Sequence, residues 1–449
     1  MMPKKLKISL IGAGGMRTPL LLEAVLQRGI VSELRLFDTS KERLGEILPI
    51  AQAALEGRGA STFLKVANKE EEAIKGVDAV IISIRPGVEQ GRIFDEGIPL
   101  KYGILGQETI GPGGIFLACR TIPAVVRYAR LVNKLSPNAW ILNFTNPVGI
   151  TTQALINAKI ERAVGICDSS QSHKYVACDY LGLDFDEVKI KVCGLNHLSF
   201  CYSITHRKKE ILFDLINDEQ FLELYYPAYS PDWVKKLGVL PNEYPYYYLN
   251  KDSAVVKMKE EQLRSEQVLR FRADLRRLVG NFNYGLMSKS GLLNNYRTIL
   301  GEREESYMSY AHPDKKRKRP LPPAEGYAGI SLDFLEGVFF RKKDVVLSIA
   351  NAKKLPRGLS PADVVEVSCN VTPKGIKLGG FGKLPNIAKG WILAQKKAER
   401  LVCEAVEKKS RSALWQAFAA SPIVPKKREA KQAFEELFEA HKEFFEGWQ

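Results

Sequence analysis

The chain has 449 residues, 45% hydrophobic and 26% charged, which is ordinary for a globular protein with room for two lobes. No apolar run approaches the roughly 20 residues of a membrane span, and no signal-peptide cleavage pattern follows the start, so we expect a cytoplasmic protein without a membrane partner. The net charge is +15, but the densest basic run, residues 315–319, is followed by prolines as in an exposed loop, and we expect no nucleic-acid partner.

The N-terminal region alternates strands with helices. Residues 6–12 are a β-rich run that ends in a glycine turn, and residues 18–28 then carry apolar residues at helical spacing. A second strand is predicted over 33–38, with a helix after it. The alternation continues with strands over 62–66, 77–84 and 139–144 and a helix over 118–135. This pattern indicates right-handed crossovers and an α/β fold, with a doubly wound parallel sheet in a Rossmann domain over residues 1–165.

The first turn has the composition of a dinucleotide site. Gly12, Gly14 and Gly15 follow the first strand, where small residues let the backbone approach a pyrophosphate at the N-terminus of the next helix. The third glycine position of the usual GxGxxG pattern falls at Arg17. Asp38 ends the second strand, where a carboxylate accepts hydrogen bonds from a ribose hydroxyl and repels a 2′-phosphate. These features favour NAD over NADP; the alternative is a tight turn in a Rossmann-like fold without nucleotide.

Beyond residue 165 the pattern is mixed, which predicts an α+β lobe for substrate and metal over residues 166–449. Strands are expected over 187–193, 198–205 and 363–371, helices over 254–278 and 385–448, and a helix followed by an extended segment over 324–355. The C-terminal helices are amphipathic, and their apolar faces suit either the lobe or a second copy of the chain.

Between residues 80 and 200 the chain holds polar and glycine-rich motifs that no hydrophobic core requires. They are Ile84-Arg-Pro-Gly87, Gly91-Arg92 with Asp95-Glu96, Gly106-Gln-Glu108-Thr109, Gly111-Pro-Gly-Gly114, Asn143-Phe-Thr-Asn146-Pro147, Ile166-Cys167-Asp168 and Gly194-Leu-Asn196-His197. In this order the set resembles glycoside hydrolase family 4, and a looser match extends from the N-terminal turn to the segment 363–368. The resemblance implies an enzyme that cleaves glycosides with NAD and a divalent metal ion.

The resemblance also implies that Cys167 and His197 bind the divalent ion, typically Mn²⁺. By themselves, a lone cysteine and a lone histidine are more often packed or hydrogen-bonded residues. A thiolate with an imidazole suits a transition metal better than Ca²⁺ or Mg²⁺, so the residue types agree with the implied ion. The seven cysteines are odd in number and lack CxxC spacing, which indicates neither a disulfide framework nor a structural zinc site.

The chemistry of the family needs both cofactors because a proton on C2 of a sugar is too weakly acidic for a side chain to remove. Hydride transfer from C3 to NAD⁺ makes a ketone at C3, which makes the proton on C2 more acidic. The metal ion acts as a Lewis acid and stabilises the charge formed when this proton leaves, and the oxygen on C1 is then eliminated. Water then adds and the hydride returns, so the net reaction is hydrolysis. In the family the base is a tyrosine, and we take Tyr244 as the candidate. The alternative role for Tyr244 is aromatic packing. Asp168 is expected to be the general acid or a residue that holds metal-bound water.

Arg92, Glu108 and Asn146 match family positions that contact the sugar or orient the cofactor and metal ligands; a buried network of salt bridges is the alternative. Relatives that take 6-phosphorylated glucosides commonly carry an Arg-Gly-Gly-Ala motif before a late helix, where this chain has Ala324-Glu-Gly-Tyr-Ala328. A glutamate thus stands where a phosphate-binding arginine is expected, although other Lys or Arg residues could supply the charge. We expect 6-phospho-β-glucosides or a related anionic sugar as substrate, and the sequence leaves the anomer open.

Two other functions stay open at this point. A plain NAD-dependent 2-hydroxy acid dehydrogenase of the malate and lactate type has a neighbouring fold, but its catalytic His-Arg-Asp set is not evident. A non-catalytic sensor of nucleotides or sugars would keep the fold and lack turnover. The family resemblance also implies a homodimer or homotetramer.

Overall fold

The structure is a computed structural model that describes residues 5–56, 62–311, 324–425 and 428–449. The basic run 315–319 lies outside these residues, and the side chain of Glu325 is not described either. In the described parts of the chain, no helix is long and apolar enough to cross a membrane.

The N-terminal half contains the parallel sheet that the alternating pattern predicts. Its strands run in the spatial order β3-β2-β1-β4-β5-β6, and each neighbouring pair is parallel. Their bounds are β1 Leu6–Ile11, β2 Val31–Phe37, β3 Phe63–Val66, β4 Ala79–Ile82, β5 Trp140–Asn143 and β6 Ala163–Gly165. This is the strand order of a doubly wound dinucleotide-binding fold, so the predicted α/β class is confirmed.

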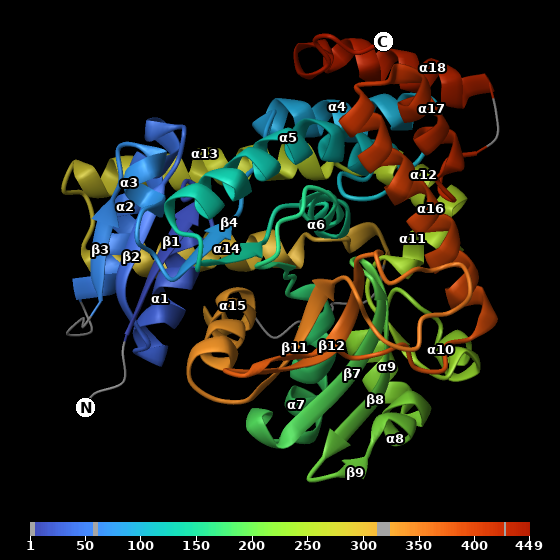
Figure 1. The fold of residues 1–449 in the computed structure, drawn as a ribbon, viewed down its shortest axis with the longest axis horizontal. Coiled ribbons are helices and arrows are strands. Elements are labelled where there is room, and N and C mark those ends of the chain that lie inside the picture. The colour runs from blue at the N-terminus through green and yellow to red at the C-terminus, as the bar shows by residue number, and fades with distance from the viewer. Residues whose placement is uncertain (1–4, 57–61, 312–323, 426–427) are drawn as a thin grey trace.

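The same sheet continues into the C-terminal half, where its strands become antiparallel. Beyond β6 the order is β11-β12-β7-β8-β10, with β13 beside β12 and β9 beside β8. Their bounds are β7 Val188–Leu195, β8 Leu198–His206, β9 Lys209–Glu210, β10 Leu240–Pro241, β11 Lys343–Ile349, β12 Val365–Thr372 and β13 Gly375–Lys377. Figure 1 shows β11, β12, β7 and β8 side by side below the parallel part. One sheet therefore supports both halves.

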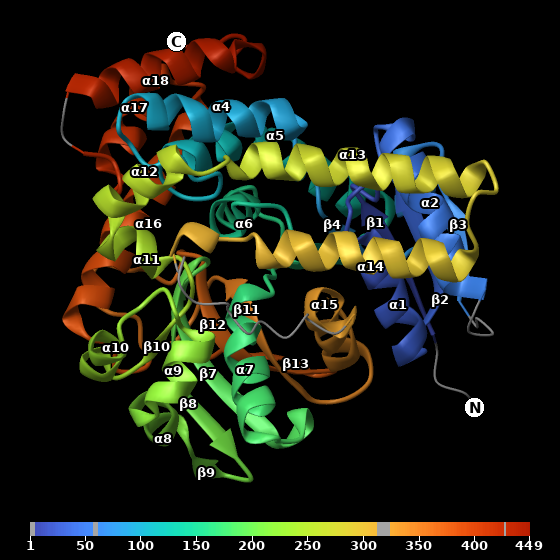
Figure 2. The same cartoon turned by 180° about the vertical axis from the view of Figure 1, so that it is seen from behind.

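Helices cover the sheet on both sides. In the N-terminal half they are α1 Thr18–Arg28, α2 Lys41–Glu56, α3 Glu70–Ile74, α4 Val88–Lys101, α5 Gly111–Leu135 and α6 Val148–Asn157. Around the antiparallel strands lie α7 Ser172–Leu181, α8 Leu212–Asn217, α9 Glu219–Tyr225, α10 Pro231–Leu237, α11 Pro245–Leu249, α12 Lys251–Glu260 and α15 Ala324–Phe339. Two long helices, α13 Arg264–Asn283 and α14 Lys289–Glu305, run side by side and pack on α4 and α2 (Figure 2). A helical pair from the C-terminal half thus covers the N-terminal half.

The C-terminal helices also pack on the N-terminal half. Helices α16 Asn386–Lys408, α17 Arg411–Ala420 and α18 Arg428–Ala440 contact α4, α5 and α6 (Figure 1). The ring of Phe116 on α5 meets those of Phe418 and Phe434 at centroid distances of 6.4 and 5.8 Å. The amphipathic face predicted for residues 385–448 is therefore buried within the chain itself.

Several helices have no counterpart among the predicted elements, and the long ones are α4 and α14. Helix α4 was not predicted because Gly91, Gly97 and Pro99 and several charged residues hide its helical spacing. Helix α5 begins at Gly111, so the Gly111-Pro-Gly-Gly114 motif forms its first turn. Glycine is required inside this turn, since a Cβ on Gly113 would lie 2.4 Å from the carbonyl oxygen of Gln107. The motif thus serves the close packing of α5 on the loop that precedes it.

A buried charged cluster ties the C-terminus to α4 and α5. Both guanidinium NH groups of Arg120 bind the carboxylate of Asp95, one of them at 3.0 Å, and His441 Nε2 lies 3.0 Å from the same carboxylate. All three side chains are buried. The Nε of Arg120 donates to the carbonyl of Pro86 at 2.9 Å, so the cluster supports the loop after β4.

We expect Asp95→Ala to lower the free energy of unfolding by about 3–5 kcal/mol, because it leaves the Arg120 guanidinium buried without its carboxylate. Equilibrium urea denaturation measures the change. The control is Glu436→Ala, which breaks an exposed pair with Lys101 and should change the free energy of unfolding little. An equal effect of the two substitutions would contradict a structural role for the cluster.

Candidate active site

A cavity of about 730 Å³ opens at the carboxyl ends of the parallel strands, where ligands bind in folds of this kind. Its walls come from the loops after β1, β2, β4, β5 and β6, the turn between β7 and β8, and the helical pair α13 and α14. Every residue that the sequence predicts for the site lines this cavity: Gly12, Gly14, Gly15, Asp38, Arg92, Glu108, Asn146, Cys167, Asp168, His197 and Tyr244. The fold therefore brings together segments that lie far apart in the sequence.

The glycine turn after β1 is closely packed. Gly12 has φ +90, and a Cβ on it would lie 2.0 Å from the carbonyl oxygen of Ser83, so no other residue fits there. The backbone N–H of Gly14 donates to Asp38 Oδ2 at 2.8 Å, and Asp38 Oδ1 accepts from the N–H of Ser40 at 2.8 Å. Asp38 thus stabilises the turn while it lines the cavity.

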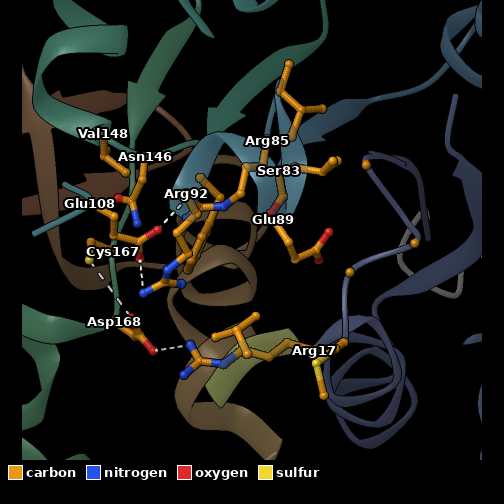
Figure 3. Close-up of a pocket in the computed structure, with 18 of the residues that line it drawn as sticks. Arg17, Ser83, Arg85, Glu89, Arg92, Glu108, Asn146, Val148, Cys167 and Asp168 are labelled. Carbon is orange, nitrogen blue, oxygen red and sulfur yellow. Dashed lines mark hydrogen bonds and ion pairs between the residues drawn. The ribbon is translucent and has the colours of Figure 1, made fainter. Parts of the chain in front are cut away.

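Arg17 is the residue directly before α1, and its side chain reaches across the cavity. Its guanidinium donates to Asp168 Oδ2 at 3.2 Å and to Glu304 Oε1 at 2.5 Å, as Figure 3 shows for the first pair. Position 17 is where the usual glycine pattern has its third glycine. The departure from that pattern therefore supplies a cation that links the cofactor turn to the loop of Cys167.

Cys167 and His197 lie together in the cavity. Their Sγ and Nε2 atoms are 3.7 Å apart, although 30 residues separate them. Cys167 follows β6, and His197 lies in the two-residue turn between β7 and β8 with φ +64, a left-handed conformation that histidine tolerates better than most residues. Gly194 permits this tight hairpin, because a Cβ there would lie 2.4 Å from the carbonyl oxygen of Leu198.

Burial sets the proton states of this pair. It lowers the pKa of His197 to about 4, so the imidazole is neutral at pH 7 and has a free lone pair. Burial raises the pKa of the Cys167 thiol to about 12, and the carboxylates of Asp168 and Glu366 act in the same direction. The thiol therefore needs a cation beside it to ionise near neutral pH.

Tyr244 packs directly on the imidazole. Its ring stacks on that of His197 at a centroid distance of 4.1 Å and an angle of 12°. The hydroxyl of Tyr307 donates to that of Tyr244 at 2.5 Å. Burial raises the pKa of Tyr244, and the hydrogen bond from Tyr307 opposes that shift. The phenol thus lies beside the Cys167–His197 pair and has the side chains of Tyr307 and Thr109 as hydrogen-bond partners.

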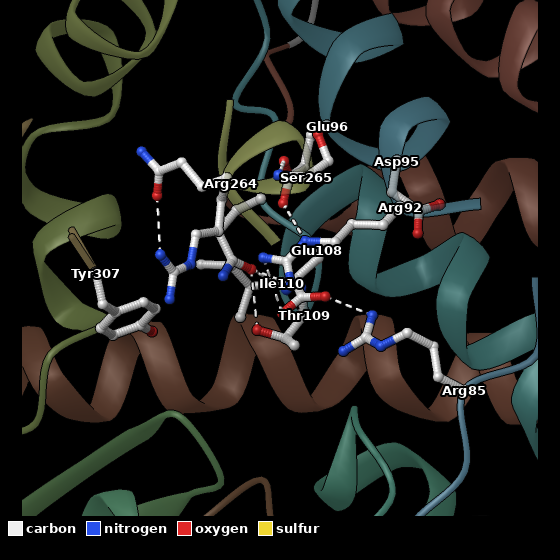
Figure 4. A network of polar contacts seen from close by, with 12 residues as sticks. Arg85, Arg92, Asp95, Glu96, Glu108, Thr109, Ile110, Arg264, Ser265 and Tyr307 are labelled. Carbon is white, nitrogen blue, oxygen red and sulfur yellow. Dashed lines mark hydrogen bonds and ion pairs between the residues drawn. The ribbon is translucent and has the colours of Figure 1, made fainter. Parts of the chain in front are cut away.

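Glu108 is the centre of a buried ionic network. Its carboxylate pairs with Arg85 and, at 3.2 Å, with Arg92, whose Nε binds Glu96 at 2.8 Å (Figure 4). Burial favours the neutral acid, but the two guanidinium groups lower the pKa of Glu108 to about 2. The network of salt bridges that the sequence suggested as an alternative role for Arg92 and Glu108 is therefore present, and both residues also line the cavity.

Asn146 has an unused acceptor. Its side chain lines the same cavity, and its Oδ1 is buried with no hydrogen-bond partner among the described residues. A buried carbonyl oxygen without a partner is costly, which points to a ligand that donates to it or binds it as a cation.

The structure adds three residues that the motifs did not reveal. Arg264 and Tyr307 line the cavity from the start of α13 and the segment after α14, and Figure 4 shows them beside the Glu108 network. Glu366 on β12 lies behind the Cys167–His197 pair. Neither Arg264 nor Tyr307 belongs to a local motif, so no signal marked them. For Glu366 there was a signal, because it is a glutamate between valines in a predicted strand.

Comparison with known proteins accounts for this arrangement. The model of the family 4 glycosyl hydrolases matches residues 7–182, and the model of their C-terminal domain matches residues 192–424. The chain belongs to glycosyl hydrolase family 4. The resemblance drawn from the sequence motifs is therefore confirmed.

Family 4 relatives match along nearly the whole chain. A probable 6-phospho-beta-glucosidase of Bacillus subtilis is 30% identical over 99% of this chain and 98% of its own, and a maltose-6′-phosphate glucosidase of the same organism is 29% identical over the same shares. The solved structure of the 6-phospho-beta glucosidase from Thermotoga maritima with manganese, NAD⁺ and glucose-6-phosphate has a TM-score of 0.80 at 25% identity, over 98% of this chain and 99% of that one.

The network around Glu108 generates a prediction for stability. Because the pKa of Glu108 is lowered to about 2, its ionised form stabilises the folded state by about 3 kcal/mol above pH 5, and this contribution is lost as the pH falls through 4 toward 2. We expect Glu108→Gln to lower the free energy of unfolding by about that amount at pH 7, with the difference from wild type narrowing below pH 4. Denaturant titrations at several pH values measure it. The exposed Glu260→Gln should show no such dependence, and a constant difference for Glu108→Gln would refute the account.

Proposed function

We propose that this family 4 enzyme hydrolyses O-glycosides of 6-phosphorylated glucose, preferring 6-phospho-β-glucosides, with NAD and Mn²⁺ as cofactors. The observation that carries the proposal is the Cys167–His197 pair, 3.7 Å apart and stacked on Tyr244 in the cavity that also contains the glycine turn. The named activities of the Bacillus subtilis and Thermotoga maritima relatives support the substrate class.

The residues present fit a bound transition metal. Thiolate and imidazole ligands lie about 2.0–2.3 Å from such an ion, so two donor atoms 3.7 Å apart can share it. The described residues contain no group of three or more His, Cys, Asp or Glu side chains around one point, so this is a two-residue site with room for substrate oxygens. The unpartnered Oδ1 of Asn146 lines the same space. A neutral imidazole and a thiol that ionises beside a cation are the donor set expected for Mn²⁺ or a similar metal.

The residues also fit NAD. Gly12 and Gly14 line the cavity beside the N-terminus of α1, where backbone N–H groups favour a pyrophosphate. Asp38 directly follows β2, in the position that accepts a ribose hydroxyl. When bound, the dinucleotide supplies reversible hydride transfer at C3 and the metal ion supplies Lewis-acid stabilisation of the adjacent oxygens.

The chain's own residues then have separate tasks. Tyr244 is proposed to take the C2 proton at its hydroxyl oxygen, with the Tyr307 hydroxyl as the partner that stabilises the phenolate. Asp168, beside Cys167 and held by Arg17, is proposed to face the leaving oxygen and to supply its proton or hold water there. Arg92, Glu108 and Asn146 are proposed to orient the sugar hydroxyls.

Arg264 is proposed to bind the 6-phosphate. The other arginines that line the cavity each have a carboxylate within 4 Å, whereas for Arg264 none lies within that distance among the described residues. It instead contacts the hydroxyl of Ser306 at 2.7 Å and the carbonyl of Arg303 at 2.7 Å. Burial, with Arg303 and Arg92 nearby, lowers the pKa of Arg264 to about 10. Arg264 is half-buried, and a cation that lines a cavity without a carboxylate partner favours an anionic ligand such as a phosphate.

The first test is release of p-nitrophenol from α- and β-glucosides, with and without 6-phosphate, while NAD⁺, Mn²⁺ and thiol are omitted in turn. We expect hydrolysis of the 6-phospho-β-glucoside that requires NAD⁺ and Mn²⁺, without net NADH. Cys167→Ala and His197→Ala should abolish activity and leave NAD⁺ binding intact, because the glycine turn belongs to other residues. Cys403→Ala, a buried cysteine remote from the cavity, is the control and should keep activity.

Other outcomes would select other functions. Steady accumulation of NADH with a 2-hydroxy acid would favour the dehydrogenase, and sugar or nucleotide binding without any turnover would favour a sensor. Preference for the α-glucoside would overturn the proposed anomer and leave the reaction standing.

The phosphate proposal has its own test. We expect Arg264→Met to lower kcat/KM for the phosphorylated glucoside roughly 10- to 100-fold, which corresponds to a loss of about 1.5–3 kcal/mol of transition-state stabilisation. No such loss is expected for any unphosphorylated substrate that reacts. Arg277→Met on the same helix, 75% exposed, is the matched control and should behave as wild type. Equal losses of kcat/KM on the phosphorylated and the unphosphorylated glucoside would show that Arg264 does not bind the phosphate.

We further propose that the enzyme works in the cytoplasm as a homodimer or homotetramer. The seven cysteines are all free thiols in the structure, which suits a reducing compartment. The oligomeric state rests on the family resemblance, and sedimentation of the purified protein tests it.

A further inference from the structure

One buried carboxylate contacts both segments that carry the proposed metal ligands, and further side chains connect it to the proposed base. Glu366 lies on β12, is 2% exposed, and forms no salt bridge with any residue that the structure describes. Its side chain is not part of the cavity wall, so it does not touch substrate. A buried carboxylate without a cation is costly, and it is tolerated only where hydrogen bonds satisfy its oxygens.

The sheet places Glu366 directly behind the metal pair. Across the sheet, Gly165 on β6 pairs with Ser348 on β11, Ser348 with Glu366, Glu366 with Gly194 on β7, and Gly194 with Ser199 on β8. Cys167 comes two residues after the first member of this row, and His197 comes three residues after Gly194. Both proposed ligands therefore lie two or three residues beyond the row of paired strand residues that contains Glu366.

The carboxylate holds both ligand-bearing segments. Ser170, three residues after Cys167, donates its hydroxyl to Glu366 Oε1, and Asn196, next to His197, donates its Nδ2 to Glu366 Oε2 at 3.0 Å. One oxygen of Glu366 thus binds the loop that carries Cys167, and the other binds the hairpin that carries His197.

The same network extends to the tyrosine. The Ser170 hydroxyl lies 3.1 Å from that of Ser199, which accepts from Asn242 Nδ2 at 3.2 Å. The Oδ1 of Asn242 in turn accepts the backbone N–H of Tyr244 at 3.1 Å. Ser170, Ser199 and Asn242 are all buried, so these bonds are shielded from water and each is costly to break.

We propose that Glu366 is a positioning residue that sets Cys167, His197 and Tyr244 in register for metal binding and proton transfer. This inference rests on the proposed function and names a residue that acts through Ser170 and Asn196 and not on the substrate. Outer-shell partners of metal ligands typically contribute 10- to 100-fold to metal affinity or activity.

The test compares Glu366→Leu, Glu366→Gln and a control, Glu336→Leu, which removes an equally buried glutamate on α15 that forms salt bridges and is not part of the cavity wall. Mn²⁺ affinity is measured from the free-ion electron paramagnetic resonance signal, NAD⁺ affinity by calorimetry, and kcat and KM with the 6-phospho-glucoside. We expect Glu366→Leu to weaken Mn²⁺ binding and lower kcat by roughly 10- to 100-fold, with unchanged NAD⁺ affinity. Glu366→Gln keeps one acceptor oxygen and should lose less, and Glu336→Leu should keep wild-type Mn²⁺ affinity.

The outcomes separate the inference from the proposed function. Wild-type Mn²⁺ affinity and kcat in Glu366→Leu, or equal loss of Mn²⁺ binding in Glu336→Leu, would overturn the positioning role. If Glu366→Leu does not fold, Ser170→Ala removes one of the same hydrogen bonds, and unchanged Mn²⁺ affinity in that variant would overturn it as well. A wild-type protein that binds Mn²⁺ and NAD⁺ but hydrolyses no glycoside would refute the proposed function, while the Mn²⁺ affinities of the variants would still decide the role of Glu366.

Discussion

The pairing of β11 with β6 connects the two halves of this protein. Gly165 faces Ser348 there, and a Cβ on Gly165 would lie 2.8 Å from that of Ser348 and 2.4 Å from the hydroxyl of Thr152. Only glycine allows the antiparallel strands to join the parallel sheet at this distance. Because the sheet is continuous, the glycine turn after β1 and the hairpin between β7 and β8 open onto one cavity at a fixed separation.

The cavity combines charge with burial. Arg17, Arg92 and Arg303 balance Asp168, Glu108 and Glu304, while Arg264 has no acid within 4 Å among the described residues. Paired charges keep the walls rigid, and the excess cation is available to an anionic ligand. At Cys167 and His197 burial has a different effect, since it lowers the pKa of the imidazole and raises that of the thiol, so both groups are neutral at pH 7.

Much of the site could be predicted because its residues belong to local motifs. The strand, glycine turn and helix around Gly12 follow from composition and periodicity alone, and Cys167, Asp168 and His197 stand in short motifs that resemble the family. The helix α4 escaped prediction, since its glycines and buried charges serve Arg120 and the Glu108 network and not an amphipathic surface. The departure at Arg17 was visible in the sequence, but its contact with Asp168 was not.

The sequence by itself determined the α/β class, the alternation of strands and helices in the N-terminal region and the motif residues, because turns, periodicity and motif spacing are local properties of the chain. Only the tertiary structure decided that Cys167 and His197 lie 3.7 Å apart, and that Arg264 on α13 and Tyr307 after α14 reach the cavity. It also decided that Glu366 joins Ser170 and Asn196, which lie beside that pair in the chain. These contacts link residues separated by 30 to 196 positions, and they depend on strand register and helix packing, which no local pattern encodes.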